Sequence, residues 1–138
     1  MKKYIMLIMS LTFLGCAKTN EAPFSVNVQL VKSNGNQYTY SCRVRNVSIK
    51  SHDVSIFYCS YDENWVSSNP GVVIERRDCN KNFITGKNLK PLQSFEHLIT
   101  VTVNSPKAVE FRLGFSPFKP GGFDHLGPYW SNEVEIKS

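Results

Sequence analysis

From Phe24 onward, apolar and polar residues alternate in short stretches, and this alternation is the feature that most constrains the fold. In 24–30 and in 38–44, every second residue is apolar. A two-residue period places successive side chains on opposite faces of a β-strand. Further alternating or β-branched stretches, separated by Gly, Pro, Asn and Ser, cover 53–59, 71–75, 94–103, 109–115 and 130–136. About seven short strands, with no amphipathic helical period over ten residues or more, predict an all-β antiparallel sandwich.

Two stretches resemble bacterial immunoglobulin-like domains. The segment NLKPLQSFEHLITV (88–101) is similar to a turn and strand of these domains in which LKPGQS leads into the strand. Leu92 stands where that pattern has Gly, so the turn geometry is expected to differ. The segment VRNVSIKSHDVSIFY (44–58) resembles their paired strands B and C. The resemblance implies an Ig-like antiparallel β-sandwich over 24–138, distantly similar to bacterial intracellular proteinase inhibitor-type domains.

The first fifteen residues have the pattern of a signal peptide. Two lysines follow Met1, and 4–14 is almost wholly apolar. A basic segment before an apolar one of this length is typical of a secretory signal. A bilayer-spanning helix needs roughly 20 apolar residues, so 1–15 is too short to be one.

The sequence Phe13-Leu14-Gly15-Cys16 resembles the lipobox of bacterial lipoproteins. The resemblance implies that Cys16 carries a diacylglycerol and an acylated amine, and that 16–23 is a tether between the membrane and the domain. Phe13 departs from the usual Leu. Ala17 stands where Asp would imply inner-membrane retention, so the resemblance favours a cell-envelope location at the outer membrane. The alternative is an ordinary signal peptide with a chance cysteine.

Charge and residue spacing exclude several classes of function. Removal of 1–15, which contains two lysines, lowers the formal charge from +5 to +3, and no basic cluster is longer than Arg76-Arg77. Nucleic acid is therefore not an expected partner.

The three histidines lack zinc spacing, and a calcium-loop pattern starting at Asp78 fails because Phe83 occupies the Gly position. We expect no metal, no cofactor and no enzymatic activity.

The cysteines predict one disulfide. If Cys16 is lipidated, three thiols remain in an exported chain, where disulfides form. Cys59 and Cys79 lie at predicted strand ends around a polar loop, and a bridge between them would add about 3 kcal/mol in the chain-entropy model. Cys42 shares the apolar face of 38–44 and is expected to be a buried free thiol. The alternative is that Cys59 and Cys79 are also free.

Aromatic residues lie in or directly beside the two longest irregular stretches of the sequence, 60–70 and 116–128. We expect a ligand-binding surface at one end of the sandwich formed by Tyr61, Trp65, Phe118, Phe123 and Tyr129, with Trp65 as the main contact. The alternative is that these rings seal the open end of the sandwich. The sequence thus predicts a membrane-anchored, non-enzymatic binding module for a protein or glycan partner. A proteinase inhibitor and a purely structural envelope component are the competing hypotheses.

Overall fold

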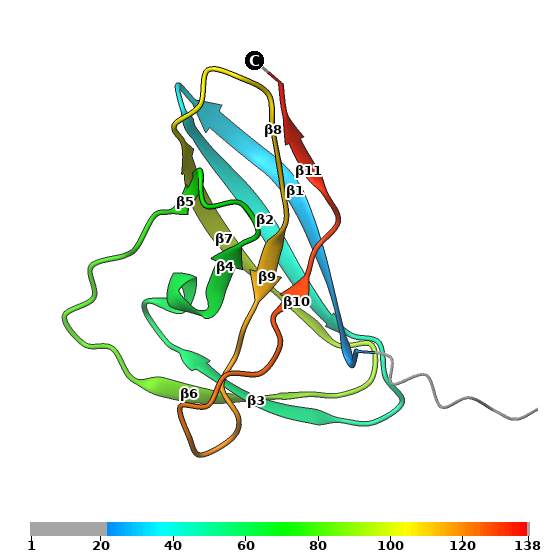
Figure 1. Ribbon diagram of the computed structural model, residues 1–138. Coiled ribbons are helices and arrows are strands. Elements are labelled where there is room, and N and C mark those ends of the chain that lie inside the picture. The colour runs from blue at the N-terminus through cyan, green and yellow to red at the C-terminus, as the bar shows by residue number, and fades with distance from the viewer. Residues whose placement is uncertain (1–21, 138) are drawn as a thin grey trace, which may run out of the picture.

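The computed structural model describes residues 22–137, and they form two layers of β-strands around one core (Figure 1). The all-β, sandwich-like fold predicted from the alternation is confirmed. The first layer is a four-stranded antiparallel sheet in the order β1-β2-β7-β5, whose bounds are Phe24–Asn34, Gln37–Asn46, Ser94–Val103 and Val72–Ile74. This order matches the A-B-E-D sheet of immunoglobulin constant-type domains.

The register of this sheet places its apolar residues on one face. Val28 lies opposite Cys42, and Cys42 lies opposite His97 on β7. In this register, the apolar residues that recur at every second position of β1, β2 and β7 all lie on the same face of the sheet. The inner face buries Phe24, Val26, Val28, Tyr40, Cys42, Val44, Val72, Ile74, Ile99, Val101 and Val103. The opposite face is mainly polar and faces solvent.

The second layer is assembled from shorter strands. Its centre is a hairpin whose first arm holds β8 (Val109–Phe111) and β9 (Leu113–Phe115), and whose second arm holds β10 (Tyr129–Trp130) and β11 (Val134–Ile136). β11 pairs with β8, and β10 pairs with β9. The other edge of this hairpin is covered by β4 (Trp65–Ser67) and then by β3 (His52–Phe57), which meets the hairpin at a bridge between Ser55 and Phe118. A 3-10 turn, η1 (Tyr61–Asn64), joins β3 to β4.

Two strands were not predicted: β4, which lies in a stretch expected to be irregular, and the longer β6. β6 (Ile84–Leu89) pairs with β3 along its whole length, yet its sequence ITGKNL has no clear alternation and contains Gly86. A strand at the edge of a layer needs only one buried position, here Leu89, so the period is weak.

Several sequence expectations lie outside the described residues. These are the signal peptide, Cys16 and the tether before Ala22. Among the residues that are described, no helix is long and apolar enough to cross a membrane.

Candidate functional site

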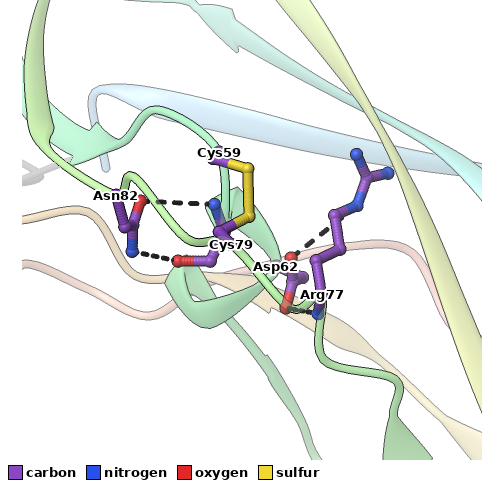
Figure 2. The surroundings of a disulfide bond; sticks show 6 residues. Cys59, Asp62, Arg77, Cys79 and Asn82 are labelled. Carbon is purple, nitrogen blue, oxygen red and sulfur yellow. Dashed lines mark hydrogen bonds and ion pairs between the residues drawn. A yellow bond between two sulfur atoms is a disulfide. The ribbon is translucent and has the colours of Figure 1, made fainter.

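The predicted disulfide is confirmed. Cys59 follows β3, Cys79 lies in the segment 75–83 that leads to β6, and their Cα atoms are 6.1 Å apart (Figure 2). Within 22–137, Cys42 is the one free cysteine, and it is fully buried as expected. Burial raises the pKa of the Cys42 thiol to about 12, with a smaller contribution from Glu96. A thiol held neutral in the core is not a nucleophile.

Hydrogen bonds hold the disulfide segment against η1 (Figure 2). The backbone N–H of Arg77 donates to Asp62 Oδ2 at 3.1 Å, and Arg77 Nε lies 3.8 Å from Asp62 Oδ1. Asp62 is buried, and Oδ1 has no hydrogen-bond partner in the described residues. On the other side of the bridge, the Asn82 amide contacts both the backbone N–H and the hydroxyl of Ser60. The segment 75–83 is therefore fixed at Arg77, Cys79 and Asn82.

Trp65 is not a surface contact, which corrects the sequence-based prediction. Its side chain is fully buried, and its indole Nε1 donates a hydrogen bond to His97 Nδ1 at 3.1 Å. The reason is that Trp65 starts β4, where it pairs with Phe115 of β9 and points into the core. A three-residue strand is too short to show a period, so the sequence carried no sign of this placement. Trp65 seals the sandwich, as the alternative proposed.

Tyr61 belongs to the same aromatic group. Its ring stacks on His97 with 4.0 Å between centroids, and the guanidinium of Arg77 lies 4.2 Å from the Tyr61 centroid. Burial, with smaller effects of Lys87 and Arg77, lowers the pKa of His97 to about 3. His97 is thus a neutral core residue that accepts a bond from Trp65, and Tyr61 is only partly exposed above it.

Asn64 brings the two long irregular stretches together. Its side-chain Oδ1 accepts the backbone N–H of Phe57 at 2.9 Å, and its Nδ2 donates to the Ser116 carbonyl at 3.2 Å. The backbone N–H of Ser116 donates to the Asn64 carbonyl at 2.8 Å. Asn64 is fully buried. The stretches 60–70 and 116–128 are therefore in contact at Asn64 and Ser116. The binding surface predicted from the sequence required these two stretches to lie together.

The aromatic residues in and directly after the 116–128 stretch divide between core and surface. Phe118 is buried against Phe57, Phe123 and His125, so it is not available to a ligand, a second correction to the predicted site. Tyr129 is half-buried and packs edge-on against Phe24. Phe123 is 73 % exposed and is the one fully accessible member of the five predicted residues.

Two exposed aromatic residues were missed. Tyr58 and Phe83 stack with 4.7 Å between centroids and 12° between ring planes, and they are 62 % and 55 % exposed. The Tyr58 backbone N–H donates to the Phe83 carbonyl at 2.8 Å, which continues the β3–β6 ladder. We call these two residues the aromatic pair. Tyr58 stands directly before Cys59, but its partner could not be found without the register of β6.

The described residues hold no group of three or more His, Cys, Asp or Glu side chains placed to bind a metal ion. Ser48 and His52 form a contact of 2.8 Å, but the Ser48 hydroxyl is also bonded to Asn46 Oδ1 and to the Lys50 carbonyl in a tight turn. This arrangement stabilises the turn and presents no free nucleophile.

No protein-family model matches the sequence, and a search of the curated proteins finds no significant match.

Proposed function

We propose that this chain is a lipid-anchored, non-enzymatic binding module of the bacterial cell envelope, and that it binds a protein partner through the aromatic pair. The observation that carries the proposal is the exposure of two stacked rings on a rigid strand end beside a disulfide. Such rings expose a large apolar area to water in the free protein, and burial of this area by a partner is favourable.

Rigidity favours binding at this position. Tyr58 directly follows β3, Phe83 directly precedes β6, and a backbone hydrogen bond joins them; Tyr58 is also next to a cysteine that is bridged to Cys79. Side chains that are ordered before association lose less conformational entropy when the partner binds. Aromatic and arginine residues are the usual energetic centres of protein interfaces, and the exposed Arg76 and Arg77 lie in the adjoining segment. This composition favours a protein over a glycan as the partner.

The test is a quantitative capture experiment from solubilised membranes, with the full chain as bait. We expect the double variant Tyr58→Ala/Phe83→Ala to recover at least about tenfold less of the partner than the native chain, as expected when central interface residues are truncated. Phe123→Ala is the control, because it removes a ring that is at least as exposed from a different loop. Equal recovery by all three baits would reject the aromatic pair as the binding surface.

The nature of the captured molecule separates the competing classes. Protease-resistant, glycosidase-sensitive material would identify a glycan partner and contradict the protein proposal. Recovery of nothing above background in repeated captures would favour a purely structural envelope component.

Proteinase inhibition is the second candidate, and one observation favours it. The segment 75–83 has exposed residues on both sides of Cys79, forms no strand before Ile84, and is anchored by the disulfide and by Asp62. An anchored, exposed, irregular segment has the form needed to enter a protease active site. Titration of the purified chain against serine, cysteine and metalloproteases decides the matter, because an inhibitor gives stoichiometric loss of activity.

A further inference from the structure

Three segments converge where the described chain begins. The Val47 N–H donates to the Pro23 carbonyl and the Leu92 N–H donates to the Asn46 carbonyl, both at 2.9 Å. The side chain of Asn46 donates to the carbonyls of Lys50 at 2.7 Å and Leu89 at 2.8 Å. Pro23 and the turns 46–51 and 89–93 therefore form one end of the sandwich, which we call the tether end (Figure 1).

Asn46-Val47-Ser48 has the Asn-X-Ser pattern of an N-glycosylation site, but the position of Asn46 in the fold argues against that role. The Asn46 amide is fully buried and donates two hydrogen bonds within the turn. It is a structural residue and not an acceptor for a glycan in the folded protein.

The tether end is unusually apolar for exposed turns. Ile49 is 92 %, Leu92 is 65 % and Val47 is 48 % exposed. Single exposed apolar residues are ordinary, but three of them in two turns that are hydrogen-bonded to each other indicate an interaction site. Lys50 and Lys90 are exposed in the same turns, and neither turn contains a carboxylate.

Leu92 carries the second observation. Its φ is 66°, in the left-handed region that favours Gly or Asn. The backbone thus keeps the conformation that a Gly at this position would have, in contrast to the sequence-based expectation of a different turn geometry. A leucine here is unfavourable twice, through its backbone and through its exposure to water. Packing within the domain explains neither disadvantage, because the side chain is 65 % exposed.

The number of residues between Cys16 and the tether end limits the distance of the tether end from the bilayer. If Cys16 is lipidated, residues 16–23 can separate the bilayer surface from the tether end by at most about 28 Å when fully extended. This upper limit on the distance holds the tether end at high effective concentration near the lipid.

We propose that the tether end docks on the bilayer surface, with Val47, Ile49 and Leu92 inserted at the headgroup boundary and Lys50 and Lys90 on anionic headgroups. Apolar residues flanked by lysines are the composition that binds this interface. The proposal rests on the lipid anchor of the proposed function. Docking would fix the orientation of the domain and place the opposite end, with the turns 35–36 and 104–108, away from the membrane. Those turns contain no large apolar side chain.

The test uses the full chain, expressed with residues 1–15 so that processing at Cys16 can occur, in phosphatidylethanolamine–phosphatidylglycerol vesicles that contain a nitroxide-labelled lipid. An environment-sensitive fluorophore is attached to Ile49→Cys in one sample and to Ser105→Cys in the other; both positions are exposed, and the native Cys42 is inaccessible. We expect the fluorophore at Ile49 to be quenched at least about threefold more than the one at Ser105. A third sample is labelled at Gln93→Cys alone, and a fourth at Gln93→Cys in a chain that also carries Val47→Ser, Ile49→Ser and Leu92→Asn. The fourth sample should show less quenching than the third.

The possible outcomes are distinguishable. Flotation of the protein with the vesicles but equal quenching at both positions would overturn the docking and leave the anchor intact. Failure to float would overturn the anchor and the docking together. Contact between fluorophores on two copies at the tether end, present equally in detergent without vesicles, would show a dimer interface and reject the bilayer as the occupant.

Discussion

The indole Nε1 of Trp65 donates a hydrogen bond to Nδ1 of His97 across the core, over a separation of 32 residues. The bond joins β4 of one layer to β7 of the other, and both side chains are buried. His97 must remain unprotonated at Nδ1 to accept it. The free energy of unfolding should therefore depend on the side chain at position 65 and on pH.

Replacement of Trp65 should act on stability. Trp65→Ala should lower the free energy of unfolding by about 3–5 kcal/mol, because it empties a fully buried aromatic site. Trp65→Phe should lose less, since the ring is largely retained and mainly the bond to His97 is lost. Urea titration followed by circular dichroism measures both variants. A Trp65→Ala change below about 1 kcal/mol would contradict this placement in the core.

Acid should destabilise the protein through His97. The pKa of His97 is lowered to about 3 in the folded state, against about 6.5 in the unfolded chain. The unfolded state therefore binds the proton first as pH falls, so the contribution of neutral His97 is complete above pH 6.5 and is lost progressively between pH 6.5 and about 3. Urea unfolding at pH 7.5, 6 and 5 should show the decline.

The control for this effect is His97→Gln, whose amide oxygen can still accept from Trp65 but does not titrate in this range. We expect the variant to lose less stability between pH 7.5 and pH 5 than the native chain does. Identical slopes in the two proteins would assign the pH dependence to other groups.

Removal of the disulfide should loosen one segment selectively. The double variant Cys59→Ser/Cys79→Ser opens a bridge between residues 20 apart in sequence, and we expect a loss of about 3 kcal/mol. Hydrogen exchange should rise most in 75–83, because this irregular segment then loses its only covalent link to the end of β3 and is held by hydrogen bonds alone. Slow exchange in β1, β2 and β7 should persist at conditions where the domain remains folded. Uniform acceleration over the whole chain would show that the bridge supports the core as well.

The lipid anchor is tested at Cys16. Cys16→Ser should abolish attachment of labelled fatty acid and should release the chain from membranes or leave it unprocessed. Metabolic labelling and membrane fractionation report the two effects. Ala17→Ser is a conservative neighbouring control, and it should behave like the native chain. Normal processing and membrane retention of the Cys16→Ser chain would contradict lipidation.

The alternation of residues was sufficient for the class of fold and for much of the first layer. Strands with a two-residue period over seven residues or more, such as the one containing Cys42, can bury their apolar face in only one way. For the same reason, the buried free thiol at Cys42 could be predicted. The pairing of Cys59 with Cys79 followed from the few cysteines present and from their positions at strand ends.

The exposed surface was decided by the tertiary structure. Trp65 and Phe118 are in segments too short or irregular to have a period, and their burial depends on which strand lies beside them, β9 for Trp65 and β3 for Phe118. The aromatic pair exists because β6 pairs with β3 in one register, which brings residues 58 and 83 together. The apolar tether end exists because Asn46 of one turn is hydrogen-bonded to Leu89 of the other, 43 residues away in sequence. Local sequence determines which face a strand buries; long-range pairing determines which side chains are left at the surface.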